Sequence, residues 1–252
     1  MNRSVHLRQL ACACSLLFSL AACGGGGDGA DESTTNVDSG TDAPAPAAPQ
    51  PGPALGEARS GEATFYDATG AGNCSFDPSP GDLRVVALNP ADYAGSAACG
   101  GFMSVRGPRG SVTVRVVDQC PGCQAGHLDL SREAFAQIAD PASGKVPVSW
   151  QFVAGQLNGP VQYRYKEGSS RWWTAIQVRN HRLPIAKLEI RPSGSSGWIT
   201  VRREPYNYFV HPGTIAPGAL QVRITAPSGA ALVDTLPEPE GGRLVSGARQ
   251  FP

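Results

Sequence analysis

The chain has 252 residues, enough for two modest hydrophobic cores. Charged residues make up 17%, and the 31 glycines and 22 prolines favour a turn-rich, mostly β protein and argue against a helical bundle. The net charge is formally zero, but residues 158–252 hold 12 Lys and Arg against 6 Asp and Glu, which leaves 9 against 15 for the part before them. A basic C-terminal half favours an acidic partner surface, or else is simply a solvated basic face; no nucleic-acid partner is predicted.

Residues 1–23 have the features of a bacterial lipoprotein signal peptide. Arg3 and Arg8 form a positive start, and the apolar run at residues 10–22 is too short to span a bilayer. The run ends in Leu-Ala-Ala-Cys23, which resembles a lipobox, so Cys23 is the expected lipidation site. We therefore expect an exported protein, held at the outer membrane or cell surface through this lipid alone. An ordinary secretory signal is the alternative.

Residues 24–59 contain glycine-rich, acidic and Ala/Pro-rich stretches with almost no large apolar side chain, which predicts a flexible tether. Beyond the signal, four of the seven cysteines remain, and an even number in an oxidising compartment predicts two disulfides. Three pairings are open, of which we prefer Cys74–Cys99 with Cys120–Cys123. A zinc site from Cys120, Cys123 and His127 has tolerable spacing but is the weaker alternative, and no metal or other cofactor is predicted.

The first domain is predicted at residues 60–155. Short apolar runs at residues 63–66, 83–88, 102–105, 112–117 and 148–153 alternate with Gly, Pro and Asp turns and predict strands. Ser131 is a good N-cap, and Ala134, Phe135 and Ile138 fall on one stripe of a short helix. This pattern predicts a small β-barrel with one helix.

Two carboxylates stand at the ends of predicted strands. Residues 112–117 lead to Asp118, and a short strand after His127 carries Asp129. Paired carboxylates near an imidazole suit proton transfer on a polyol, because one group must hold a proton while the other stays ionised. In the structural alternative, Asp118 accepts hydrogen bonds from the turn at Gly122, and Asp129 places negative charge near a helix N-terminus.

The second domain is predicted at residues 160–252. Strand candidates separated by turn residues favour a β-sandwich. They lie at residues 161–165, 173–178, 185–190, 198–201, 206–210, 219–224 and 231–236.

Four segments together resemble the bacterial expansins. They are Asp-Gln-Cys-Pro-Gly-Cys at residues 118–123, His-Leu-Asp-Leu-Ser at 127–131, and the long string Lys-Glu-Gly-Ser-Ser-Arg-Trp-Trp-Thr-Ala-Ile-Gln-Val-Arg-Asn-His at 166–181, with Asp-Thr-Leu-Pro at 234–237. The resemblance covers residues 61–252. It implies an all-β fold, a six-stranded double-psi β-barrel followed by an immunoglobulin-like β-sandwich that serves as a carbohydrate-binding module.

The resemblance also implies roles for individual residues. In the barrel groove, Asp129 matches the family's essential aspartate, Asp118 its partner and Thr64 the flanking hydroxyl. Tyr66 stands where a small hydroxyl residue can occur, and Cys120 stands where an aromatic can sit. On the second domain, an aromatic platform and an adjacent basic residue match Trp172, Trp173, Tyr206 and Lys166.

The two adjacent tryptophans can belong to one platform only under a geometric condition. Adjacent residues of a regular strand point to opposite faces, so Trp172 and Trp173 share a surface only if the backbone departs from regular β structure there. The Gly-Ser-Ser segment at residues 168–170 makes that departure plausible. Trp150 and Trp198 are predicted to belong to the cores.

The implied function is binding to cellulose and other plant cell-wall polysaccharides, with loosening of the wall by non-hydrolytic disruption of glucan contacts. The alternative is a glycoside-cleaving enzyme, an endoglucanase or a lytic transglycosylase of peptidoglycan, with Asp129 as general acid. Inverting hydrolysis needs a second carboxylate roughly 6.5–9.5 Å away. Asp67 and Asp118 are the candidates, and an inward-pointing Asp67 favours hydrolysis. We expect a monomer.

Overall fold

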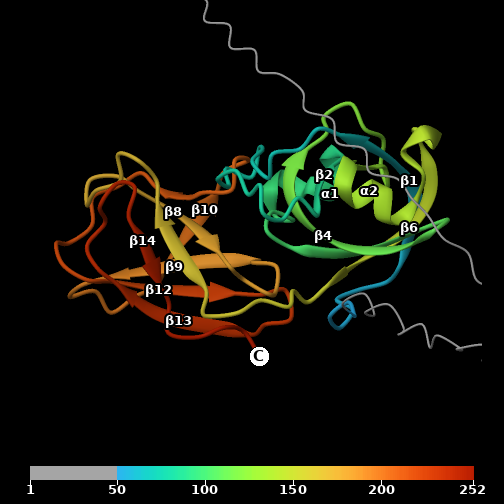
Figure 1. Ribbon diagram of the computed structural model, residues 1–252. Helices are drawn as coiled ribbons and strands as arrows, with labels where there is room; N and C mark the ends of the chain where they lie inside the picture. Colours follow the sequence, from blue (N-terminus) through green and yellow to red (C-terminus); the bar gives the residue numbers. More distant parts are fainter. Residues whose placement is uncertain (1–49) are drawn as a thin grey trace, which may run out of the picture. The chain divides into compact units, whose positions relative to one another are not determined.

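The computed structural model describes residues 50–252, and its first six strands close into a barrel (Figure 1). The strands are β1 (Arg59–Tyr66), β2 (Val85–Leu88), β3 (Phe102–Gly107), β4 (Gly110–Gln119), β5 (Leu128–Ser131) and β6 (Val146–Val153). Around the barrel they follow the order β1-β5-β2-β4-β3-β6, with β1 parallel to β5 and β2 parallel to β4. This is the predicted six-stranded double-psi barrel.

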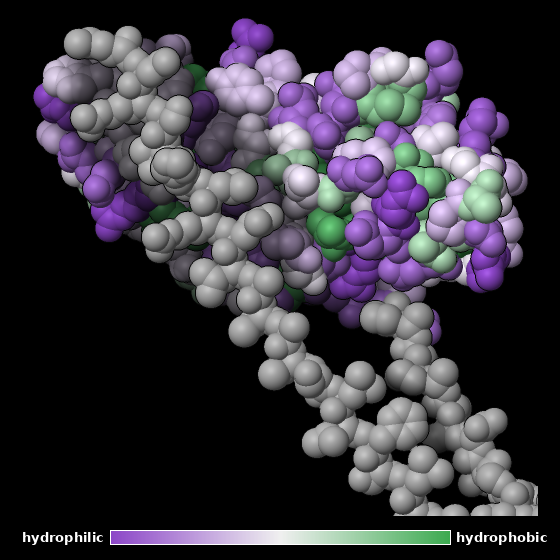
Figure 2. Space-filling model, turned by 45° about the horizontal axis from the view of Figure 1, so that its top comes forward, coloured by the Kyte–Doolittle hydropathy of each residue, from purple (hydrophilic) through white to green (hydrophobic). Residues whose placement is uncertain are grey.

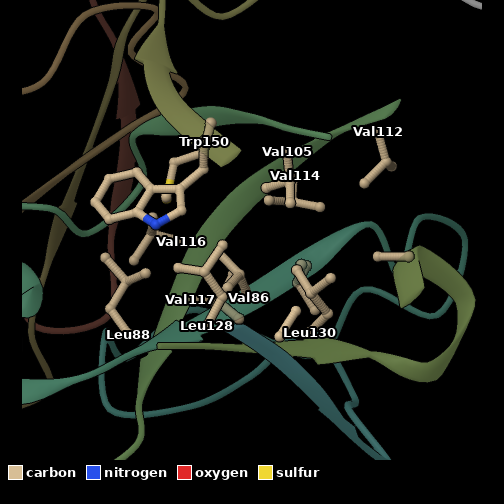
Figure 3. Close-up of a cluster of buried hydrophobic side chains, with 14 of the residues drawn as sticks. Val86, Leu88, Val105, Val112, Val114, Val116, Val117, Leu128, Leu130 and Trp150 are labelled. Atoms are coloured by element: carbon tan, nitrogen blue, oxygen red, sulfur yellow. The ribbon is translucent and has the colours of Figure 1, made fainter. Parts of the chain in front are cut away.

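Branched apolar side chains fill the barrel. Figure 3 shows valines and leucines from β2, β3, β4 and β5 directed toward one another, with the Trp150 indole beside them. Trp150 is 2% exposed, as predicted for a core residue, and its indole N–H donates to the carbonyl of Gly126 at 3.2 Å. The hydrogen bond satisfies the one polar atom that this large side chain brings into the core.

A β-bulge in the pairing of β2 with β4 reverses the direction in which β4 side chains point. Val86 pairs with Val116, but the next residue, Ala87, pairs with Asp118, so Val117 is an extra residue. Every second residue of β4 is buried, at Val112, Val114 and Val116, and Asp118 is the next residue in this alternation. Without the extra residue, Asp118 would therefore point into the barrel. The bulge buries Val117 and turns the carboxylate outward.

Two short α-helices and two 3-10 turns complete the barrel domain. They are α1 (Pro90–Tyr93), η1 (Ala94–Ser96), α2 (Arg132–Ile138) and η2 (Pro141–Ser143). Ser131 caps α2 as predicted, because its hydroxyl accepts the Ala134 N–H at 3.1 Å. The apolar stripe of α2 packs on the barrel, with Phe135 against Phe65 at 4.8 Å between ring centroids.

The remaining strands form two four-stranded layers. They are β7 (Gln162–Tyr165), β8 (Thr174–Arg179), β9 (Lys187–Pro192), β10 (Ile199–Arg203), β11 (Phe209–His211), β12 (Leu220–Thr225), β13 (Ala231–Leu236) and β14 (Leu244–Ser246). One layer has the order β13-β12-β9-β10 and the other β11-β8-β7-β14, and the short pairing of β10 with β11 connects them. The predicted sandwich is confirmed, and β14 is a strand that the sequence patterns do not predict.

The turn between β10 and β11 contacts the barrel through backbone carbonyls. The hydroxyl of Tyr93 donates to Pro205 O at 2.8 Å, and the hydroxyl of Ser96 donates to Glu204 O at 2.8 Å. In the opposite direction, the amides of Gln177 and Asn207 donate to Cys74 O at 2.8 and 3.1 Å. The loop around Cys74 therefore contacts the sandwich with backbone atoms of fixed direction.

Two disulfides, Cys74–Cys99 and Cys120–Cys123, are formed, as preferred from the sequence. Cys74 and Cys99 are buried, with 0% and 2% exposure. The carbonyl of Cys74 accepts the hydrogen bonds from the sandwich. This disulfide therefore ties the loop around Cys74 to the segment around Cys99, which follows α1 and η1.

The predicted tether extends to residue 59, but its last residues contact the barrel. Ala54 bridges to Val153, and the Leu55 N–H donates to Phe152 O at 2.8 Å. The prediction is wrong there because backbone pairing to the edge of β6 needs no large apolar side chain. The predicted signal peptide, the Cys23 lipidation site and the tether up to residue 49 lie outside the described residues.

Figure 2 shows a face on which hydrophilic residues predominate and hydrophobic residues form separate patches. None of the helices between residues 50 and 252 is long and apolar enough to cross a lipid bilayer.

Candidate functional site

The groove residues form a row across four neighbouring strands. Thr64 of β1 pairs with Asp129 of β5, Asp129 pairs with Ala87 of β2, and Ala87 pairs with Asp118 of β4. Strands lie about 4.8 Å apart, so the backbones of the two aspartates are about 10 Å apart. Ala87, which lies between the two aspartates in this row, is buried with 3% exposure.

Asp129 belongs to a three-residue hydrogen-bond network. The hydroxyl of Thr64 donates to Asp129 Oδ1 at 2.7 Å and lies 2.9 Å from His127 Nε2. Because that hydroxyl has one hydrogen, which it gives to the carboxylate, the imidazole donates and Thr64 accepts. Thr64 therefore contacts both His127 and Asp129 and orients both groups.

Asp118 is held by backbone groups rather than by side chains. Its Oδ1 accepts the N–H of Asn73 at 2.7 Å and the N–H of Gln119 at 2.8 Å. The structural alternative expected the donors in the turn at Gly122, and that expectation is wrong: one donor comes from the loop near Cys74. A Cβ added at Gly72 would lie 2.4 Å from the Asp118 carboxyl carbon, so glycine allows this loop to pass so close.

Tyr66 lies near both aspartates. Burial raises the pKa of the Tyr66 phenol, and the negative charges of Asp118 and Asp129 raise it further. Its hydroxyl is buried and has no hydrogen-bond partner among residues 50–252. The phenol thus stays protonated at neutral pH, and its hydroxyl is covered by the surrounding residues.

Asp67 does not join the two other carboxylates. Its side chain is 86% exposed and pairs with the Arg132 guanidinium, at 3.2 Å from Nε, at the start of α2. Asp67 therefore does not point into the groove, which is the orientation that would favour hydrolysis. Asp67 directly follows the end of β1 at Tyr66, so the alternation along β1 no longer controls its side chain.

The zinc alternative is wrong because its two cysteines are bonded to each other. Within residues 50–252, no three His, Cys, Asp or Glu side chains are grouped as a metal site. Cys120 follows β4 directly, and its N–H donates to Leu88 O at 2.8 Å. The disulfide therefore closes a tight turn beside Asp118.

On the sandwich, the two adjacent tryptophans lie in a turn that precedes β8. The Ser170 N–H donates to Trp173 O at 2.8 Å, and the Trp173 N–H donates back to Ser170 O at 3.2 Å. The backbone therefore departs from a regular strand at this point, which is the condition for both indoles to share one surface. Trp172 is 59% exposed, the highest exposure of any aromatic side chain in residues 50–252.

Tyr206 and Lys166 both contact a third residue, Tyr208. The rings of Tyr206 and Tyr208 lie 6.0 Å apart between centroids, and Lys166 Nζ lies 5.7 Å from the Tyr208 centroid. Tyr208 is 5% exposed, so it supports the two partly exposed side chains from below. Tyr208 is a site residue that the sequence does not single out.

A short segment of the barrel connects the groove to Tyr206. Asn73 donates its backbone N–H to Asp118, and its amide lies 3.4 Å from Pro205 O. The Ser75 hydroxyl donates to Tyr206 O at 2.9 Å. Asn73 and Ser75 also escape sequence analysis, because loop residues show no periodicity and their roles depend on contacts more than 100 positions away.

Trp198 is not a core residue, contrary to the prediction. It is partly exposed, and two guanidinium groups lie over its ring. The guanidinium carbon of Arg191 is 4.8 Å from the ring centroid, and that of Arg223 is 4.4 Å from it. Cation–π contact with two guanidinium groups explains how this indole is stabilised at the surface.

Known proteins resemble this chain in both sequence and structure. A family model described as lytic transglycolase matches residues 86–150. Expansin-YoaJ of Bacillus subtilis is 41% identical over 215 residues, which cover 81% of this chain and 91% of that protein. Expansin-like protein 1 of Dictyostelium discoideum is 30% identical over 201 residues, 75% of this chain and 70% of that protein.

Two solved structures have the same architecture. The crystal structure of apo-Clavibacter michiganensis expansin is 40% identical, with a TM-score of 0.70 over 77% of this chain and 98% of that one. A mutant of that expansin in complex with cellohexaose is 39% identical, with a TM-score of 0.71 and the same coverage.

Proposed function

The chain belongs to the expansin family, and from that premise we propose that it binds cellulose and related plant cell-wall polysaccharides and loosens the wall without hydrolysis. Binding is assigned to the aromatic surface of Trp172, Trp173 and Tyr206 with Lys166 beside it. Loosening is assigned to the groove of Thr64, Tyr66, His127, Asp118 and Asp129.

The observation that carries the proposal is the exposed indole of Trp172 in a turn beside Trp173. An exposed aromatic ring is costly to keep in water, and pyranose rings have apolar faces that cover it without exact polar registry. A related expansin has been crystallised with cellohexaose, which supports a β-glucan as the ligand class.

In the groove, the described residues suit the gripping of a polyol. Asp129 offers acceptor oxygens whose direction is set by Thr64, and Asp118 offers a second carboxylate that two backbone N–H groups hold in place. A glucan chain seated there exchanges hydrogen bonds with its neighbours for hydrogen bonds with these groups. Such an exchange weakens glucan contacts and breaks no covalent bond.

Hydrolysis is the competing function, and the pairing of Asp67 with Arg132 argues against it. Asp118 remains as the second groove carboxylate, about two strand spacings from Asp129. The decisive experiment therefore includes both aspartates.

Export, lipidation of Cys23 and attachment at the outer membrane or cell surface are further parts of the proposal, and they rest on residues 1–23 alone. A monomer with no cofactor is proposed. Peptidoglycan is the second polysaccharide to test.

The test measures three quantities on the same protein: reducing ends released from cellulose, xylan and peptidoglycan, binding to the same solids, and extension of wall strips under load. The variants are Asp129→Asn and Asp118→Asn, with Asp67→Asn as the matched control because it neutralises an exposed carboxylate outside the network. We expect extension without product release, lost in Asp129→Asn and kept in Asp67→Asn, with cellulose binding unchanged in all variants. Steady product release that Asp129→Asn abolishes would contradict the proposal.

The aromatic surface is tested with Trp172→Ala, for which Trp198→Ala is the matched control. Burying one large aromatic side chain contributes about 1.5–3 kcal/mol, so we expect cellulose affinity to fall at least about tenfold in Trp172→Ala. Equal losses in the two variants would contradict the assignment of binding to this turn.

A further inference from the structure

A cleft with both polar and apolar lining lies on the outer face of β4, away from the groove. It consists of two adjoining cavities of about 350 and 190 Å³ that share Phe102, Arg115 and Leu157 as lining residues. The larger lies over β4 of the barrel, and the smaller lies between the barrel and the sandwich, beside Arg179 and His181. None of the groove or platform residues lines either cavity.

Arg115 stands at the junction of the two cavities. Its neighbours Val114 and Val116 point into the barrel, so its side chain points outward, where the guanidinium lies 4.7 Å from the Phe76 centroid. Among residues 50–252, no acceptor forms a hydrogen bond or ion pair with this guanidinium; only its backbone N–H is bonded, to Arg84 O. Burial lowers the pKa of Arg115, and the charge of Arg179 lowers it further, against a smaller opposing effect of Asp82.

The other charges around the cleft are already balanced. Arg84 pairs with Asp82 through two nitrogens, at 2.9 and 2.8 Å. Arg179 and Arg164 share Asp77, at 2.6 and 2.9 Å, and Glu167 lies 4.0 Å from Arg164 as its second acidic partner. His181 is buried, and burial lowers its pKa to about 4, so it is neutral at pH 7. The cleft therefore carries one uncompensated positive charge, which matches one carboxylate and not a dianion.

The remaining lining is that of a sugar site. Amide side chains line both cavities, Gln137 and Gln156 in the larger and Gln162 and Asn180 in the smaller, and hydroxyl groups line the larger one as well. Phe102 offers an apolar ring to both. Amides and hydroxyls bind sugar hydroxyls, while the planar fork of an arginine matches a carboxylate with two parallel hydrogen bonds.

We propose that this cleft binds a uronic-acid residue of an acidic polysaccharide, with its carboxylate on Arg115 and its pyranose ring against Phe102. The site is separate from the aromatic surface that binds neutral glucan in the proposed function. An acidic polysaccharide and cellulose could then occupy one molecule together.

The experiment is calorimetric titration of the purified full chain with soluble probes: trigalacturonate, a glucuronate-substituted xylotriose, cellohexaose, acetate and inorganic phosphate. The variants are Arg115→Gln and Arg115→Lys, with Arg106→Gln as matched control because Arg106 is an exposed arginine on the neighbouring strand β3. Thermal unfolding of each variant checks the fold. The Nε–H resonance of Arg115, identified by its absence in Arg115→Lys, reports contact directly.

We expect the two uronate probes to bind and to shift that resonance. Their affinity should fall at least about tenfold in Arg115→Gln, less in Arg115→Lys, and not at all in Arg106→Gln. Cellohexaose should bind all variants equally, and its failure to bind would bear on the proposed function only. Absence of uronate binding, an unchanged affinity in a folded Arg115→Gln, or phosphate or acetate binding as tightly as the uronates would overturn the proposal.

Discussion

Replacing Thr64 with valine tests whether Thr64 orients the groove. Valine has nearly the same shape as threonine and the same preference for strands, so β1 should keep its pairing with β5. The substitution removes the hydroxyl that donates to Asp129 at 2.7 Å and lies 2.9 Å from His127. Asp129 and His127 then lose their common partner.

The magnitude follows from these two bonds. A hydrogen bond to a charged group contributes about 1.5–3 kcal/mol when buried, but this site is only partly buried and water replaces part of the loss. We therefore expect unfolding free energy to fall by about 1 kcal/mol, which lowers Tm by about 2–4 °C. If about 1.4 kcal/mol of oriented contact with the glucan is lost as well, the affinity of the groove falls about tenfold.

The assay compares wall-strip extension at subsaturating protein with binding to cellulose. We expect Thr64→Val to extend walls about tenfold more slowly at unchanged cellulose binding, and Thr64→Ser, which restores the hydroxyl, to recover most of the rate. Thr200→Val is the matched control, since Thr200 is an exposed strand residue of the sandwich. Full extension activity in Thr64→Val, or equal loss in Thr64→Ser, would refute the orienting role.

Gly72→Ala should lower stability by about 1–3 kcal/mol and reduce wall extension, because its Cβ would lie 2.4 Å from the Asp118 carboxyl carbon; thermal unfolding and the extension assay measure both. Replacing both cysteines of Cys74–Cys99 with alanine should cost about 3 kcal/mol, since the closed loop spans 25 positions; guanidinium unfolding that shows no loss would contradict this. Because burial lowers the pKa of His181 to about 4, the unfolded chain binds the extra proton between pH 6.5 and 4. Stability should therefore be highest above pH 6.5 and decline by up to about 3 kcal/mol toward pH 4, and a chain with His181→Asn should lose this decline in denaturant titrations.

Local patterns were sufficient where one strand or helix acts alone. The Ser131 cap, the apolar stripe of α2 and the turn at residues 170–173 before β8 are encoded within a few residues. The strand at residues 244–246 was missed because three residues, mostly exposed, show no usable alternation.

The direction of a side chain could not be predicted where pairing between strands changes it. Asp118 is the next residue in the series of alternate β4 residues that point into the barrel, and only the bulge at Val117 turns its side chain outward. Asp67 lies just beyond β1, and its pairing with Arg132 depends on where α2 begins. Trp198 is apolar enough for a core, but Arg191 and Arg223 from two neighbouring strands hold it at the surface.

The sequence by itself determined the all-β class and the two groups of strands, because these depend on residue type and local spacing. It left three disulfide pairings open, and it pointed to the groove and aromatic residues only through the resemblance to the expansins. Only the tertiary structure decided that Thr64 joins Asp129 to His127, that Asn73 connects Asp118 to the turn before β11, and that Arg115 is left without an acceptor among the described residues. These facts depend on atoms that lie tens to more than a hundred positions apart in the chain. Their distances are set by barrel closure and strand register, which no local pattern records.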